Sequence, residues 1–264
     1  RRSLAHSIYV VPSGERMELT NSEPVSAGLI LQCTLQCPLT CAHCITDSSP
    51  SRRERLSLEM LLRLIEEAAA LGVRTVGFTG GEPFLLGSDL KECIDLVHAR
   101  EMKALVITSA YWAKSEARAR QVLEPLAGIA MLGLSTDIYH QHFVKLQRLR
   151  HAISAAHGLG IDRIEVQITS FTEADVSKIR GQLGEVGKLA TYRFQKLWPI
   201  RRARSLLGGH QGSLSSIDKL DLRCPMGPPV VSATGLLNGC CSSLLALGAD
   251  SPIMLGDLNE KTLH

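Results

Sequence analysis

Three cysteines stand close together in this sequence, Cys37, Cys41 and Cys44, in a C-x3-C-x2-C spacing. The spacing places three thiols in one tight loop, and thiolates are soft ligands that suit iron–sulfur clusters or zinc. Three thiolates on a four-iron cluster leave one iron open to a small molecule. A structural zinc site would instead need a closed set of four ligands, with His43 as the nearest fourth. The spacing favours an iron–sulfur cluster and leaves zinc as the alternative.

The elements that must position this loop follow a regular alternation of short apolar runs and helical segments. Six such alternations predict a parallel α/β sheet with right-handed crossovers, either doubly wound or curved into a partial barrel. In both arrangements ligands bind at the carboxyl ends of the strands. The expected strands are residues 25–32, 74–79, 103–108, 130–135, 163–169 and 191–197, and the expected helices are 57–71, 88–100, 115–126, 143–158 and 174–186.

Small and polar residues follow two of these strands. The turn after the second strand is Gly80, Gly81, Glu82 and Pro83, in which glycine lets the backbone approach a ligand and a carboxylate can accept from an ammonium group. After the fourth strand come Ser135 and Asp137, whose side chains can bind hydroxyl groups or cap the next helix. For Thr108 and Ser109, and for His140 and His142, capping or packing competes with a role in chemistry.

Cys33 lies four residues before Cys37 and could complete a closed four-thiol cluster, which would remove the open iron. The favoured interpretation is a thiol at the end of the first strand that points into the barrel, as a structural residue or as part of the active-site lining. Cys93 lies alone on a helix face and is expected to be inert.

The composition is typical of a globular protein, with 264 residues of which 45% are hydrophobic and 21% are charged. The formal net charge of +3 is too small to indicate nucleic acid or a membrane as a partner. We expect the basic runs at 52–55 and 201–204 to be solvated. No apolar run approaches the roughly 18 residues of a membrane helix, and no apolar segment of a signal peptide follows the N-terminus. These features predict a cytoplasmic protein.

Seven of the eight cysteines fall in two clusters, which in a cytosolic enzyme indicates metal rather than a disulfide framework. The second cluster is Cys224, Cys240 and Cys241, in a segment with thin apolar content that we expect a metal to order. The predicted organisation is an N-terminal arm at 1–24, a (βα)6 core at 25–205 and a small cysteine-containing extension at 206–264.

The cysteine loop after the first strand and the turn at residues 80–83 together resemble the radical S-adenosylmethionine (radical SAM) superfamily, whose GGEP motif matches letter for letter. The resemblance implies a partial (βα)6 TIM-like barrel. It also implies a [4Fe–4S] cluster on Cys37, Cys41 and Cys44, with SAM chelated by the open iron. In that family the reduced cluster cleaves SAM to methionine and a 5′-deoxyadenosyl radical, which takes a hydrogen atom from the substrate.

Further contacts with SAM are implied by the same resemblance. The GGEP turn binds the amino group in the family, and Ser135 and Asp137 would bind the ribose hydroxyls. His43 stands where members usually have an aromatic residue packed near the adenine, and its ring can do the same. After the sixth strand many members carry a P-x-G-R-A stretch, in which Arg201 here takes the place of the glycine.

The C-terminal segment resembles the start of the SPASM or twitch extension of radical SAM enzymes. In that extension a cysteine, a strand–Gly–strand hairpin and further cysteines hold a second iron–sulfur cluster. Cys224, Cys240 and Cys241 would be the ligands here, although the full SPASM pattern contains more cysteines. Zinc and plain structural cysteines are the alternatives.

The predicted reaction is hydrogen abstraction from a small molecule such as a sugar or nucleoside, leading to C–S bond formation or epimerisation. We weigh it against maturation of a ribosomal peptide by cross-linking or oxidation. About 24 residues precede the first strand, with no separate peptide-binding domain among them, which favours the small substrate. A rival of another class is a non-catalytic iron–sulfur or zinc protein that binds a partner or passes electrons. The resemblance also implies an electron donor of the flavodoxin or ferredoxin type.

Overall fold

The structure, a computed structural model, describes residues 28–126, 128–197, 200–207, 227–240 and 250–263. Its strands are β1 (Gly28–Thr34), β2 (Thr75–Gly80), β3 (Lys103–Thr108), β4 (Ile129–Ser135), β5 (Arg163–Ser170), β6 (Thr191–Lys196), β7 (Val230–Val231), β8 (Leu236–Asn238) and β9 (Met254–Asp257). Its α-helices are α1 (Leu58–Ala70), α2 (Ser88–Ala99), α3 (Glu116–Leu123), α4 (Leu146–Gly158) and α5 (Ala174–Leu183). Short 3-10 helices are η2 (Pro83–Leu86), η3 (Glu124–Leu126), η4 (His140–His142), η5 (Gly184–Leu189) and η6 (Arg201–Leu207).

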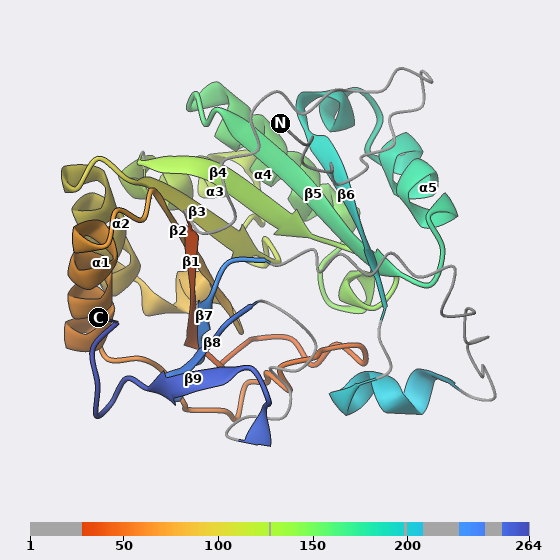
Figure 1. Ribbon diagram of the computed structural model, residues 1–264. Helices are drawn as coiled ribbons and strands as arrows, with labels where there is room; N and C mark the ends of the chain where they lie inside the picture. Colours follow the sequence, from red (N-terminus) through yellow and green to blue (C-terminus); the bar gives the residue numbers. More distant parts are fainter. Residues whose placement is uncertain (1–27, 127, 198–199, 208–226, 241–249, 264) are drawn as a thin grey trace, which may run out of the picture.

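One sheet contains all these strands, in the order β6-β5-β4-β3-β2-β1-β7-β8-β9. Strands β1 to β6 are parallel to their neighbours, and the helices lie along the outer side of the curved sheet (Figure 1). The order is linear, so within the described residues the barrel does not close. The predicted partial barrel is therefore confirmed, and the carboxyl ends of β1 to β4 share one edge.

Helix α1 shows how the sequence sets these elements. Ser57 caps its N-terminus by accepting from the Met60 amide at 3.1 Å, and apolar residues at helical spacing bury one face, including Leu61 and Ile65. The chain leaves the helix through Gly72, whose φ of +77° favours glycine.

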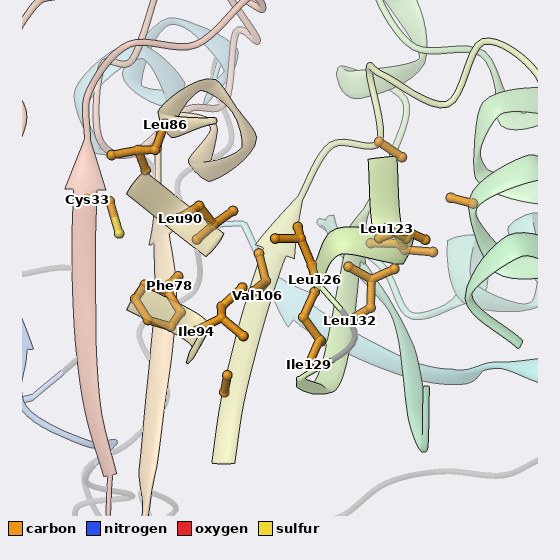
Figure 2. Packing of buried hydrophobic residues seen from close by; sticks show 14 of the residues in the cluster. Cys33, Phe78, Leu86, Leu90, Ile94, Val106, Leu123, Leu126, Ile129 and Leu132 are labelled. Carbon is orange, nitrogen blue, oxygen red and sulfur yellow. The ribbon is translucent and has the colours of Figure 1, made fainter. Parts of the chain in front are cut away.

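The side of the sheet that faces the helices is apolar. It includes Leu31, Cys33 and Phe78, all fully buried. Leu90 of α2 belongs to the same cluster and lies near Cys33 and Phe78 (Figure 2). The Cys33 thiol donates to the Leu31 carbonyl at 3.3 Å and lies on this helix side (Figure 2). The expectation that Cys33 points into the barrel is therefore wrong, because the alternation along β1 turns it outward together with Leu31.

The C-terminal strands extend the same sheet beyond β1. Strand β7 pairs in parallel with β1. A turn at Gly235, whose φ is +88°, joins β7 to the antiparallel β8, and β9 pairs antiparallel with β8. The chain after β9 contacts α1, where Arg63 donates to the Leu258 carbonyl at 2.7 Å. The predicted arm at 1–24, and residues 208–226 and 241–249 of the predicted extension, lie outside the described residues. No helix in the described part of the chain is long and apolar enough to cross a membrane.

Candidate active site

The predicted cysteine cluster occupies the loop that follows β1. Cys37 donates its amide to the Ser49 carbonyl at 3.1 Å, and the Cys44 amide donates to the Cys41 carbonyl at 3.1 Å. Cys37 and Cys41 are 8% and 5% exposed, whereas Cys44 is only half-buried. The loop therefore presents two shielded thiols and one closer to solvent.

The electrostatics of these thiols fit a metal cluster. Burial is the main cause that raises the pKa of Cys37 and of Cys41 to about 12, and the charges of Glu82 near Cys37 and of Asp137 near Cys41 act in the same direction. Burial also acts on Cys44, but hydrogen bonds from Thr46 and Arg202 outweigh it and lower its pKa. Three soft donors in one loop suit iron, whose binding would displace their protons.

The GGEP turn is pressed against the cysteine loop. Gly81 donates its amide to the Thr34 carbonyl at 2.6 Å, and Glu82 donates its amide to the Gln36 carbonyl at 2.9 Å. A Cβ atom at Gly81 would lie 2.6 Å from the Gln36 carbonyl carbon, and Gly80 has a φ of +125°. The two glycines are thus needed for the close approach of two loops.

The Glu82 carboxylate is fully buried and ties the end of β2 to the end of β3. It accepts from the Thr108 hydroxyl at 2.7 Å, from the Ser109 hydroxyl at 2.7 Å and from the Ser109 amide at 3.1 Å. Burial raises the pKa of Glu82 although these hydrogen bonds oppose the shift. Thr108 and Ser109 therefore hydrogen-bond the Glu82 carboxylate and do not cap α3, whose N-cap is Ser115. A contact between Glu82 and the SAM amino group stays a prediction.

Asp137 lies at the centre of a second network and is 1% exposed. One of its oxygens, Oδ2, bonds His140 Nδ1 at 2.7 Å and His43 Nε2 at 3.1 Å, while Oδ1 accepts from the Tyr139 and His140 amides at 2.9 Å each. The His43 ring stacks on Tyr139, with centroids 4.8 Å apart. Burial opposes ionisation, but hydrogen bonds from both histidines hold the pKa of Asp137 below its usual range.

This network joins the end of β4 to the cysteine loop, a link that sequence reasoning missed. Both oxygens of Asp137 are engaged, so contact with a ribose would have to replace one of these bonds. Ser135 lies on the inner face of the sheet, in register with Gln167 of β5. The predicted ribose and adenine contacts of Ser135, Asp137 and His43 stay predictions.

Two buried polar atoms near this network have no hydrogen-bond partner among the described residues, His43 Nδ1 and Thr136 Oγ1. Three possible metal-ligand atoms also lie within 4.8 Å of one another: the sulfur of Cys41 and one ring nitrogen each of His43 and His140. Unpaired polar atoms are costly in a protein interior. Their presence beside three thiols favours a site that is completed by a bound group.

The second cysteine cluster is only partly described. Cys240 follows β8, is half-buried and is a free thiol, while Cys224 and Cys241 lie outside the described residues. The strand–Gly–strand hairpin expected in this segment is present as β7, Gly235 and β8. A second cluster stays a prediction.

The segment after β6 brings another unforeseen residue to the site. Arg201, which stands at the glycine position of the P-x-G-R-A stretch, has a φ of +50°, the left-handed conformation that favours glycine. The next residue, Arg202, donates to the Ser48 carbonyl at 2.6 Å and hydrogen-bonds Cys44. The basic run at 201–204 offered the only signal for this contact.

Comparisons with known proteins extend this picture. The chain is 41% identical over 86 residues to PqqA peptide cyclase of Granulibacter bethesdensis, covering 31% of this chain and 22% of the relative. It is 36% identical over 177 residues to GTP 3′,8-cyclase of Synechococcus sp. (strain CC9902), covering 67% of this chain and 42% of the relative. The chain thus spans less than half of the length of these curated relatives.

Among solved structures, SuiB of Streptococcus suis bound to its precursor peptide SuiA shares the fold with a TM-score of 0.65, at 14% identity, over 90% of this chain and 63% of that one. The model of the radical SAM superfamily matches residues 31–186, which include the cysteine loop, the GGEP turn and Asp137. The chain therefore belongs to the radical SAM superfamily, whose enzymes use a [4Fe–4S] cluster and SAM.

Proposed function

We propose that this chain is the catalytic core of a radical SAM enzyme that modifies a peptide. The observation that carries the proposal is likeness to peptide-acting proteins, PqqA peptide cyclase in sequence and peptide-bound SuiB in fold. These comparisons favour the peptide alternative over the small-molecule substrate expected from the sequence. The small-molecule expectation rested on the short segment before the first strand. Likeness to proteins that act on peptides is stronger support for a substrate class.

The inner face of the open sheet supports a peptide substrate. Residues that pair in parallel register share a face, so Ser135, Gln167 and Arg193 lie side by side across β4, β5 and β6. Gln167 Nε2 donates to Glu165 Oε1 at 2.9 Å, which adds a buried carboxylate to the same face. A peptide backbone presents donors and acceptors at every residue, and this polar row can pair with both.

In this proposal Cys37, Cys41 and Cys44 bind the cluster, and the turn at residues 80–83 binds the SAM amino group. Asp137 orients His43 for packing against the adenine, and Ser135 contacts the ribose. When bound, the cluster and SAM supply a 5′-deoxyadenosyl radical for hydrogen abstraction. The protein's part is to hold both groups, aim the substrate and keep water from the buried end of the sheet.

We also propose that residues 25–205 form the core and that residues 206–264 form a separate extension in which Cys224, Cys240 and Cys241 bind a second cluster. The strands β7 to β9 would then attach that cluster to the edge of the sheet beside β1. The content of iron and sulfide tests this directly. About four irons per chain indicate one cluster, and about seven or eight indicate two.

The first experiment asks whether the chain cleaves SAM. The protein is purified and reconstituted without oxygen, then incubated with SAM and dithionite, and 5′-deoxyadenosine is measured. We expect product, and none from a variant with Cys37, Cys41 and Cys44 changed to Ala. Equal product from both proteins would refute the assignment of these ligands. Zinc without iron in the purified protein would favour the non-catalytic rival.

A second experiment asks about the substrate class. Short peptides encoded beside the gene are coexpressed with the enzyme and weighed by mass spectrometry, and loss of two hydrogen masses is expected for a cross-link or an oxidation. The likeness to GTP 3′,8-cyclase supports a nucleotide as the second candidate. GTP is therefore the control substrate. GTP-dependent 5′-deoxyadenosine with unchanged peptides would overturn the peptide proposal and keep the radical SAM assignment.

A further inference from the structure

The inner face of the sheet, opposite the helices, changes in character between β4 and β5. Leu105 of β3 pairs with Met131 of β4, and Met131 pairs with Arg163 of β5, so the three residues share this face. Glu165 lies two residues after Arg163 on the same face of β5, and Arg193 lies on the same face of β6. An apolar stretch of the inner face therefore borders a charged one.

Glu165 is the buried centre of the charged stretch, with 1% of the residue exposed. A carboxylate buried to this extent is costly unless partners satisfy its oxygens. Arg163 Nη2 donates to Glu165 Oε2 at 2.5 Å, and Gln167 Nε2 donates to Glu165 Oε1 at 2.9 Å. Each oxygen thus has a hydrogen-bond donor from β5 itself, and the carboxylate does not depend on Arg193.

Arg193 stands apart from this network. Its Nη1 lies 3.9 Å from Glu165 Oε1, which is beyond hydrogen-bond distance, and 47% of its side chain is exposed. On the preceding residue, the Tyr192 hydroxyl donates to the Gly187 carbonyl at 2.9 Å on the helix side, so Arg193 points to the inner side. Within the described ranges Glu165 is the one charged or hydrogen-bonding neighbour of this guanidinium, which leaves its N–H donors for a ligand.

The register of the sheet places Arg193 level with the candidate active site. Arg193 pairs with Gln167, and Gln167 pairs with Ser135, the last residue of β4. Neighbouring strands lie about 4.8 Å apart, so Arg193 and Ser135 are about 10 Å apart across the sheet. Asp137 follows Ser135 by two residues and belongs to the network that reaches the cysteine loop.

We propose that Arg193 binds an anionic group of the substrate and so selects which substrates reach the site. The proposal rests on the proposed function, which places SAM at the carboxyl ends of the strands. A guanidinium binds carboxylates and phosphates alike, through two parallel hydrogen bonds. In a peptide substrate the group is the carboxylate of an acidic side chain, and in a nucleotide it is a phosphate.

The distance across the sheet also restricts where the anionic group lies in a peptide. An extended chain rises about 3.3 Å per residue. If the ribose of SAM lies at Ser135, the 10 Å to Arg193 corresponds to about three residues. The acidic residue is therefore expected within about three positions of the residue that is modified.

The test measures binding of charged probes and of their uncharged counterparts to the reconstituted full chain in the presence of SAM. The peptide probes are synthetic copies of the short peptides encoded beside the gene, each in a native form and in a form with every acidic residue replaced by its amide. Both forms have an amidated C-terminus, so side chains carry the only carboxylates. GTP is the phosphate probe, and guanosine is its counterpart. Affinities are measured by titration calorimetry.

Variants of Arg193 should separate charged from uncharged probes. Arg193→Gln should weaken binding of a native peptide by about tenfold or more and of its amide form by less than about twofold. Arg193→Lys should retain part of the affinity, because it keeps the charge and loses the two parallel bonds. The matched control is Lys178→Gln, which removes an exposed charge on α5 and should leave both affinities unchanged. All three variants should unfold within about 2 °C of the parent, because each changes an exposed side chain.

The two sources of the anion give different patterns. A loss confined to the native peptide identifies a carboxylate, and a loss confined to GTP rather than guanosine identifies a phosphate. Equal losses for charged and uncharged probes would overturn the proposal, as would failure of both charged probes to bind the parent. Unchanged affinities in Arg193→Gln would also overturn it, because the arginine would then only keep an edge strand solvated. Absence of 5′-deoxyadenosine from the parent with SAM and dithionite would count against the proposed function instead, so the two failures are distinguishable.

Discussion

The contact between the GGEP turn and the cysteine loop yields the sharpest prediction, the effect of Gly81→Ala. The added Cβ atom would lie 2.6 Å from the Gln36 carbonyl carbon and 2.9 Å from that of Leu35, whereas ordinary contact begins near 3.4 Å. Both neighbours are backbone atoms, so no side-chain rotation can make room. The Gln36 carbonyl oxygen lies closer still, so the loops must separate by more than about 0.8 Å, and overpacking of this kind costs about 3 kcal/mol.

The assay is thermal unfolding of the cluster-free chain, followed by iron content after reconstitution. A loss of about 3 kcal/mol lowers the unfolding temperature by about 6–12 °C in a chain of this size. The matched control is Gly181→Ala, in the exposed part of α5, where nothing lies within 4 Å of the new Cβ atom. That change should raise stability by about 0.5–1 kcal/mol, because alanine is the better helix former.

Iron content separates the two ways in which Gly81→Ala can act. If the turn positions the thiols, the variant should bind less than half of the iron of the parent even well below its unfolding temperature. An unfolding temperature within about 2 °C of the parent would refute the steric argument. Full iron content in a destabilised variant would show that the turn supports the fold without setting the geometry of the thiols.

Three further predictions follow from the same geometry. Cys33→Ala should keep full iron content and SAM cleavage, because the thiol faces the helices. Loss of iron in this variant would instead support a closed cluster in which Cys33 is the fourth ligand. Asp137→Asn should lower stability by about 1–3 kcal/mol and reduce iron uptake, as seen by unfolding and iron assay. Because the pKa of Asp137 is depressed in the folded state, its contribution to stability is present at neutral pH and is lost as the pH falls below about 4. Between neutral and acid pH the free energy of unfolding of Asp137→Asn should therefore change less than that of the parent. Ser57→Ala should cost about 1 kcal/mol in denaturant unfolding, through loss of the cap on α1.

Periodicity in the sequence predicted the six parallel strands and placed each within a few residues of its observed bounds. The first strand, for example, ends at Thr34 instead of residue 32. Local patterns succeed here because a buried parallel strand must be apolar and a helix between strands must be amphipathic. The same patterns did not orient Cys33, since a run of consecutive apolar residues hides which face each one takes.

The contacts that build the site escaped prediction for a different reason. The bond from Asp137 to His43, and the contact of Arg202 with Ser48 and Cys44, join residues on separate loops at the edge of the sheet. Nothing in the spacing of either loop encodes its partner. The GGEP match singled out this turn, whereas the bonds from Glu82 to the end of β3 are seen only in the structure.

These contacts join the loops of the site pairwise. The Glu82 amide connects the turn after β2 to the loop after β1, the Glu82 carboxylate connects this turn to β3, and Asp137 connects the end of β4 back to the loop after β1. Small metal domains order their ligands only when the metal binds, and the ordering draws on the binding energy. In this chain backbone and carboxylate hydrogen bonds join the loops around the three thiols. If Cys37, Cys41 and Cys44 bind the proposed cluster, these bonds would help to position them for it.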